Sequence, residues 1–575
     1  MFFWRQQYLY LAALAVLAGG LAASAAEIPE GPAVAGFRVT HTLKVGRAPH
    51  GIRFSPDGTK ALVVLAGEGK VAVVDLGQMK VLTKLAAGKL PLDLVALSPP
   101  GGGPGQWVVS QFLDGTTLIG MSETAQPMPG PWTVGKGPSL FTPDTVQGKT
   151  YITSEFADEL TLFDTRAAKI LGHFPTCKQP YPADVTPDGV LAFVPCRGDG
   201  MVAVIDLLNQ KTAATVPVGQ KLEGGALTRD GVSYIAASGG TNEVVYVNTA
   251  AYEVTARVAE GIGPRPFSVA TTLDGRYALA NNSGGDTLSI LDVAGRRVIG
   301  RLKVGKQPIV VRMHPDGRRV LVANEVSDSL NVIELPPPPQ AQAPSPARPN
   351  EVIVVGTIHG EHRTSKRYSL DVLRGLVRAI KPDYVLAEIP PNRFDKAQEQ
   401  FLAGQTIVEP RVRVFPEYVD VMFPLSKEMG FQIIPTAGWN QPMHTFRNEA
   451  LKRLSEDSAR AAEWKAYQEA QAKSEAALKA GGMPDDPRYI HSDAYDNALE
   501  IDLKVYATFD KDLGTGGWET INKAHYANIV RALDAHRGEG KRFLITYGAG
   551  HKGWFLRQLR QRSDIKVLDV APFLK

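Results

Sequence analysis

The chain has 575 residues, of which 44% are hydrophobic and 21% are charged, and its formal net charge is +4. A chain of this length is too long to fold around a single hydrophobic core, so we expect at least two domains. The composition argues against a disordered or polytopic membrane protein, and the small charge without a basic run argues against a nucleic-acid partner.

Residues 1–26 have the pattern of a secretory signal. Arg5 precedes an apolar stretch over residues 8–18, and the small residues Ala23-Ser24-Ala25-Ala26 have the character of a cleavage site. An uncleaved N-terminal anchor is the alternative. Both interpretations predict an exported protein, periplasmic or extracellular, and no later window of the sequence has the length or purity of a membrane span.

A repeated unit of roughly 41 to 47 residues follows, which is the spacing of propeller blades. Each unit combines a turn such as Ser55-Pro56-Asp57-Gly58 with a strand such as Val73-Val74-Asp75-Leu76. The units begin near Gly46, Gly88, Gly135, Cys177, Gly219, Gly261 and Gly305. This pattern predicts an all-β, seven-bladed propeller over residues 37–335, and its repeats resemble those of the YVTN family.

The ends of the repeat region predict how the ring closes. The seventh unit stops at Leu335 after three strands, whereas residues 37–45 form an unpaired strand of the type that ends the other units. Pairing the two removes an exposed sheet edge. We expect the propeller to be a binding scaffold for a protein, a peptide or a small-molecule ligand.

The two cysteines, Cys177 and Cys196, fall at the same end of one predicted hairpin, whose turn is Pro187-Asp188-Gly189. An oxidising compartment permits a bond between them, so we predict a structural disulfide. Two buried free thiols are the alternative.

A proline-rich segment at residues 336–349 is predicted to be a semi-rigid linker. Beyond it, at residues 350–575, strands alternate with helices, which predicts an α/β domain with a mixed, partly parallel sheet. We expect strands at 352–356, 384–389, 431–436, 543–547 and 565–570, and helices at 370–380, 448–478 and 553–562.

Three polar residues follow strands of this domain: His359 in Gly356-Thr357-Ile358-His359, Glu388 after Tyr384-Val385-Leu386-Ala387, and His551 in Gly548-Ala549-Gly550-His551. Ligand sites of α/β sheets lie at the carboxyl ends of strands. Two imidazoles and a carboxylate suit Zn, Mn or Co and leave a position for water. Without a metal, either histidine could act as general base with Glu388 orienting it. Hydrogen-bonded turn residues are the plainer alternative.

Neighbouring residues extend this candidate site. Gly356, Gly548 and Gly550 permit tight turns, and the last two open a helix whose amides can hold an oxyanion or a bound group. Glu361, His362 and His444 are further candidates, as residues that contact the ligands or add one more. For Glu361 and His362, the alternative is that they are solvated loop residues.

The three motifs resemble those of the TraB/TIKI, ChaN and erythromycin-esterase superfamily over about residues 351–575. That superfamily includes a metal-dependent protease, a lactone esterase and a haem-binding lipoprotein. The resemblance implies a metal-dependent hydrolase of amide or ester bonds. Non-catalytic binding of haem or metal, or a surface interaction protein, is the alternative. One departure concerns the arginine-containing helix that precedes the last strand in that superfamily: the corresponding residues here, 518–529, contain no arginine, and Lys523 and Asn528 are candidate substitutes.

Overall fold

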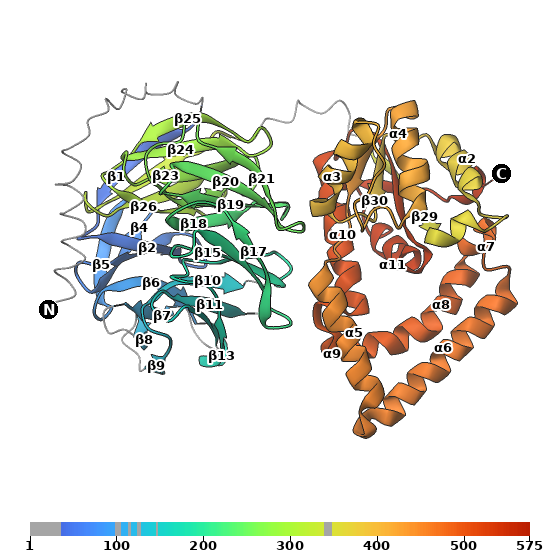
Figure 1. Ribbon diagram of the computed structural model, residues 1–575, viewed down its shortest axis with the longest axis horizontal. Helices are drawn as coiled ribbons and strands as arrows, with labels where there is room; N and C mark the ends of the chain where they lie inside the picture. The colour runs from blue at the N-terminus through green and yellow to red at the C-terminus, as the bar shows by residue number, and fades with distance from the viewer. Residues whose placement is uncertain are drawn as a thin grey trace.

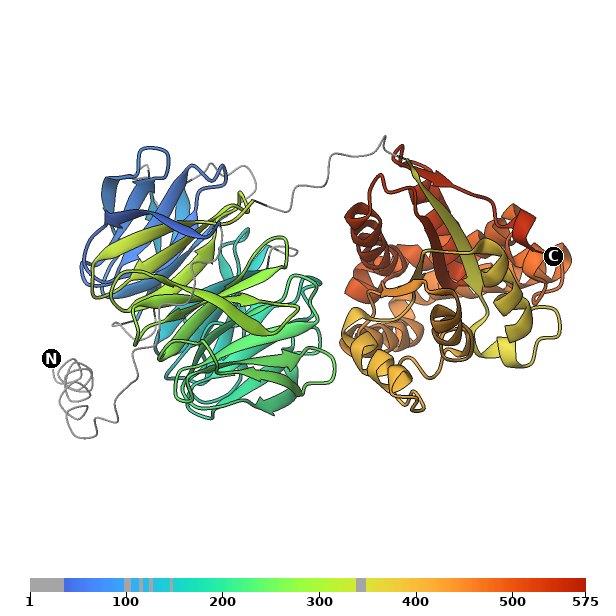
Figure 2. The ribbon, with the colours of Figure 1, turned by 90° about the horizontal axis from the view of Figure 1, so that it is seen from above.

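The computed structural model describes residues 36–97, 105–112, 117–123, 128–144, 148–337 and 348–574. An all-β half and an α/β half lie side by side (Figures 1 and 2). The predicted signal at residues 1–26, most of the linker and most of a Gly/Pro-rich insertion at residues 99–105 lie outside the described residues.

The N-terminal half is a propeller of seven four-stranded antiparallel sheets. Its first three blades are β2 (Pro49–Phe54), β3 (Lys60–Leu65), β4 (Lys70–Asp75) and β5 (Lys80–Ala86); β6 (Pro91–Ala96), β7 (Gln106–Gln111), β8 (Thr117–Ser122) and β9 (Trp132–Thr133); and β10 (Pro138–Asp144), β11 (Lys149–Ser154), β12 (Glu159–Asp164) and β13 (Lys169–Pro175). The next three are β14 (Asp184–Val185), β15 (Leu191–Cys196), β16 (Met201–Asp206) and β17 (Lys211–Pro217); β18 (Leu222–Leu227), β19 (Ser233–Ser238), β20 (Glu243–Asn248) and β21 (Val254–Val258); and β22 (Pro266–Thr271), β23 (Tyr277–Asn282), β24 (Thr287–Asp292) and β25 (Arg297–Lys303). The predicted seven-bladed fold is confirmed.

The seventh blade joins the two ends of the repeat region. It comprises β26 (Pro308–Met313), β27 (Arg319–Asn324) and β28 (Ser329–Glu334), completed by β1 (Arg38–Lys44). β1 pairs antiparallel with β28. The predicted closure is confirmed, and β28 is thereby no longer an exposed edge.

Local chemistry explains the turns and the disulfide. The Asp57 carboxylate accepts hydrogen bonds from Ser55 Oγ and the Thr59 amide, and Gly58 takes a φ of 70°. This is the left-handed conformation that glycine adopts readily. Cys177 and Cys196 form the predicted disulfide, with their Cα atoms 5.6 Å apart. It ties the segment before β14 to the end of β15.

The C-terminal half is built on a five-stranded sheet in the order β31-β30-β32-β29-β33. The strands are β29 (Asn350–Thr357), β30 (Tyr384–Ala387), β31 (Gln432–Pro435), β32 (Arg542–Gly548) and β33 (Ile565–Val567). All four pairings are parallel, so the prediction of a mixed sheet is wrong. The reason is that helical crossovers connect successive strands and return the chain to the same end of the sheet.

Helices surround this sheet and extend beyond it as an arm formed by α5, α6 and α8 (Figure 1). They are α2 (Leu370–Ile380), α3 (Pro391–Leu402), α4 (Phe423–Met429), α5 (Gln441–Glu456), α6 (Ala461–Gly481), α7 (Pro487–Ile490), α8 (Asp493–Tyr506), α9 (Asp510–Leu513), α10 (Trp518–Ala535) and α11 (Ala549–Leu559). The helix predicted over residues 448–478 is two helices, because the Asp457 carboxylate accepts a hydrogen bond from the Ala459 amide and begins a new turn there. In the described part of the chain, no helix has the length and apolar character needed to cross a membrane.

The two halves share a buried contact. Met443 and Ile521 belong to the same apolar cluster as Val190, Leu191 and other propeller residues. Polar bonds accompany it: Asn440 Nδ2 donates to Asp188 Oδ2 at 2.7 Å. The Pro-Asp-Gly turn of one blade is therefore also a docking point for the α/β half.

Candidate functional site

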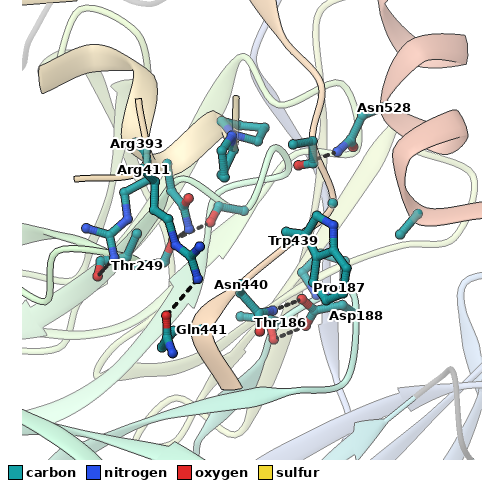
Figure 3. A pocket seen from close by; sticks show the side chains of 18 of the residues that line it. Thr186, Pro187, Asp188, Thr249, Arg393, Arg411, Trp439, Asn440, Gln441 and Asn528 are labelled. Atoms are coloured by element: carbon teal, nitrogen blue, oxygen red, sulfur yellow. Dashed lines mark hydrogen bonds between the residues drawn. The ribbon is translucent and has the colours of Figure 1, made fainter. Parts of the chain in front are cut away.

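One cavity of about 530 Å³ lies between the two halves. His359, Glu388 and His551 all line it. Turns of the propeller, with Asp188 and Thr249, and the start of α5, with Gln441, line it as well (Figure 3). His359, Glu388 and His551 follow β29, β30 and β32, at the same end of the parallel sheet. The topology thus brings together three side chains that are far apart along the chain.

His359 begins the short helical turn η1 (His359–Arg363) with a φ of 47°, which is unusual for a residue other than glycine. Its Nδ1 donates to Glu417 Oε1 at 2.6 Å, so its Nε2 faces away from Glu417 and lies 3.9 Å from Glu388 Oε2. Glu417 is fully buried and also accepts from Thr357 Oγ1. Burial alone would lower the pKa of His359, but the hydrogen bond and charge of Glu417 outweigh it and raise that pKa.

His551 lies in the first turn of α11. Its Nδ1 donates to Asn522 Oδ1 at 2.7 Å. The amide of Asn522 is oriented by its own bond from Nδ2 to the carbonyl of Trp518, whose indole stacks on the His551 ring. Burial, with a smaller contribution from the charge of His359, lowers the pKa of His551 to about 4. The ring is therefore neutral at physiological pH, with the lone pair of Nε2 unshared with Asn522.

Glu388 directly follows β30 and is buried. Its Oε2 accepts from the Gly548 amide at 2.8 Å, and its own amide donates to the hydroxyl of Tyr418. Burial raises the pKa of Glu388 to about 7, more than His359 and the Gly548 amide lower it. This carboxyl can therefore hold or release a proton near neutral pH.

His525, a residue of α10, adds a third ring. Glu388, His525 and His551 each offer one atom within 4.8 Å of the others, an arrangement that could hold a metal ion. However, the Gly438 amide donates to His525 Nδ1 at 2.7 Å, so the neutral ring carries its proton on Nε2. Burial keeps the pKa of His525 well below its usual value. His525 is thus suited to donate a hydrogen bond, whereas His359 and His551 are suited to accept one or to bind a metal.

Gly548 is needed for this geometry. A Cβ atom at Gly548 would lie 2.6 Å from His359 Nε2 and 3.7 Å from Glu388 Oε2. At Gly356 a Cβ would lie 3.0 Å from the Cα of Ala549, so that glycine lets β29 approach α11. At Gly550 the nearest atom to a Cβ is 3.9 Å away, and no steric need for glycine exists there.

The other predicted site residues lie further out. His362 is buried, and its two nitrogens bond to the carbonyl of Tyr368 and the amide of Ile358, which leaves neither free for a ligand. Glu361 is exposed on η1, and His444 lines the cavity on α5.

Sequence reasoning missed several residues of the site. Glu417 lies in η2 (Glu417–Met422), a segment with few carboxylates among apolar residues, which is a signal that the sequence offers. No residue pattern near Glu417 indicates that it contacts His359. The helix thought to lack arginine continues to Ala535, and Arg531 lines the cavity. Of the two suggested substitutes, Asn528 lines the cavity, whereas Lys523 is exposed on α10.

Comparison with known proteins adds one similarity. No family model matches the chain, and no curated protein matches it. Among solved structures, it is similar to hydrazine synthase of Kuenenia stuttgartiensis, with 19% identity and a TM-score of 0.45, over 50% of this chain and 95% of that chain. A likeness at this level concerns the fold alone and assigns no activity. The resemblances to the YVTN and TraB/TIKI families remain predictions.

Proposed function

We propose that this protein hydrolyses an ester or amide bond in the cavity between its two halves. We propose further that His359, Glu388 and His551 hold a divalent metal there, Zn, Mn or Co. The observation that carries the proposal is the state of the two rings. Each has its Nδ1 bonded to a buried oxygen acceptor, Glu417 or Asn522. The Nε2 of His359 lies 3.9 Å from Glu388 Oε2, and His551 offers a ring nitrogen within 4.8 Å of a Glu388 oxygen.

The donor set fits a metal. Histidine ligands of metals usually donate their other N–H to a carboxylate or carbonyl oxygen, as His359 and His551 do here. Two ligands of one tetrahedral zinc ion lie about 3.4 Å apart for bonds near 2.1 Å. The 3.9 Å between His359 Nε2 and Glu388 Oε2 therefore needs only a small side-chain movement.

The chain's own groups supply the remaining chemistry of hydrolysis. A bound metal would lower the pKa of a water molecule to about 7 and polarise the substrate carbonyl. His525 Nε2–H is buried and without an acceptor among the described residues, so it can donate to an oxygen that gains negative charge during the reaction. Glu388 would be ionised as a metal ligand; in the metal-free alternative, its pKa of about 7 would let it take up a proton and deliver it to the leaving group.

Metal analysis of the purified full chain tests this. We expect about one equivalent of metal per chain, and a strong loss of metal in His551→Gln and in His359→Gln. His444→Gln is the matched control, because His444 lines the same cavity but its ring bonds to Asn448 Nδ2 at 3.4 Å, away from the His/Glu cluster. Unchanged metal content in both site variants would contradict the proposal.

Hydrolysis of p-nitrophenyl acetate provides a second readout. We expect a chelator to abolish it and added zinc to restore it. Hydrolysis that survives metal removal but is lost in His359→Gln would favour a metal-free mechanism, with the His359–Glu417 pair as general base. A haem absorption band in the purified protein would favour the ligand-binding alternative instead.

Export is part of the same proposal. The disulfide between Cys177 and Cys196 is typical of proteins in oxidising compartments. We propose a periplasmic or extracellular protein in which the propeller serves as a scaffold and supplies one wall of the cavity. Fractionation of cells that produce the full chain tests this, and recovery in the cytoplasm with free thiols would contradict it.

A further inference from the structure

The cavity has a wall that the proposed metal ligands do not explain. Three propeller segments line it, around Asp188, Asp230 and Ala250, opposite residues of α5 and of the loops that precede α3 and α5. Its volume of about 530 Å³ is in the range of small-molecule sites. Ligands in such a cavity contact both halves of the protein.

Positive side chains predominate in this lining. They are Arg229, Arg393, Arg411, Arg447 and Arg531. Arg393 pairs with Glu409 at 3.3 Å, but within the residues that the structure describes, the other four arginines form no ion pair. The propeller carboxylates of the lining, Asp188 and Asp230, form no ion pair with these arginines among the described residues; they accept hydrogen bonds from Thr186, Thr228 and Asn440.

Two of the unpaired arginines lie on or against the first half of α5. Arg411 Nη2 donates to Gln441 Oε1 at 2.7 Å (Figure 3), and Arg447 follows Gln441 by six residues on the same helix. Arg447 is half-buried: its guanidinium lies 4.7 Å from the Trp439 ring centre, and its Nε is buried without an acceptor. His444 lies between Gln441 and Arg447, and burial and the charges of Arg447 and Arg411 lower its pKa. Both arginines therefore line the same cavity along α5, one bonded to Gln441 and the other over Trp439.

A half-buried guanidinium without a counter-ion, as at Arg447, is costly in free energy. Arginine forms strong paired hydrogen bonds with carboxylate and phosphate groups. Trp439 and Phe415 also line the cavity and offer apolar contact for the rest of a ligand. The cavity thus combines an anion-binding end with an apolar surface and the His/Glu cluster.

We propose that the substrate is an anion, and that Arg411 and Arg447 bind its carboxylate or phosphate group while its scissile bond lies at His359, Glu388 and His551. The inference that an anion binds depends on the arginines alone. The inference that this anion is the substrate depends also on the proposed function. The propeller closes the cavity over this ligand and so takes part in selecting it.

Calorimetric titration of the full chain with succinate and, separately, with inorganic phosphate tests the proposal. We expect Arg411→Gln/Arg447→Gln to weaken binding roughly tenfold to a hundredfold, the usual worth of a hydrogen bond to a charged group. The matched control is Arg413→Gln/Arg453→Gln. It removes two positive charges from the same loop and helix, but at exposed positions outside the cavity.

A third variant separates the arginines from the metal. In His551→Ala we expect anion binding to persist, because the arginines are untouched. The proposal is overturned if the wild type binds neither anion, if both double variants bind as the wild type does, or if binding is lost in His551→Ala alone. Anion binding without any ester hydrolysis would refute the proposed function and leave this anion site standing. Ester hydrolysis without anion binding would refute the anion site and leave the proposed function standing.

Discussion

Asn522→Leu tests whether the orientation of His551 matters for the site. Asn522 is fully buried on α10, and its Oδ1 is the acceptor for His551 Nδ1–H at 2.7 Å. Leucine has a similar volume but no acceptor. In the variant, His551 Nδ1–H is left buried without a partner, and the ring can rotate or change tautomer.

The size of the effect follows from these contacts. Leaving one buried donor unsatisfied costs about 1–3 kcal/mol of folding free energy. The loss of a hydrogen-bond partner behind a metal-binding histidine typically lowers metal affinity about 10- to 100-fold. We therefore expect both a modest loss of stability and a large loss of metal affinity.

Competition with a chromogenic zinc chelator measures the affinity, and urea unfolding measures the stability. Asn528→Leu is the matched control: Asn528 lies on the same helix and lines the cavity, but its side chain donates to the carbonyl of Thr436 and accepts no hydrogen bond from His551. It should lose stability but keep its metal affinity. If Asn522→Leu loses stability yet binds zinc as tightly as the wild type, Asn522 does not orient a ligand and the reasoning is refuted.

Two further predictions concern stability. Replacing both Cys177 and Cys196 by alanine opens a loop of sequence separation 19, which should lower the free energy of unfolding by about 3 kcal/mol; an unchanged urea midpoint would contradict this. Burial lowers the pKa of His491 from 6.5 to about 4, while the neutral ring accepts from the Gly356 amide. The unfolded chain binds this proton first, so stability should fall as pH drops from 6.5 towards 4, by up to about 3 kcal/mol. His491→Gln should reduce that dependence in unfolding experiments, although His551 and His525, whose pKa values are also lowered, keep part of it; a slope equal to that of the wild type would refute the prediction.

Short-range patterns in the sequence predicted most of the propeller. Turns such as the one at Asp57 and Gly58 are made by adjacent residues, and the blade repeat follows from their regular spacing. Even the closure of the ring was predictable. Residues 37–45 form an extra strand before the first repeat, and the seventh repeat lacks its fourth strand, so the two complete one blade. In the α/β half, α2 begins and ends where predicted, since Ser369 caps a regular apolar pattern.

The sequence by itself determined which residues end the strands of the α/β half, and so indicated His359, Glu388 and His551. Only the tertiary structure decided their partners. Glu417 reaches His359 from a π-helical turn 58 residues away, and Asn522 reaches His551 from α10. The tertiary structure alone placed the propeller turns and Arg411 around the same cavity. The physical reason is that hydrogen-bond partners and burial depend on packing between distant segments, and no local pattern of residues records that packing.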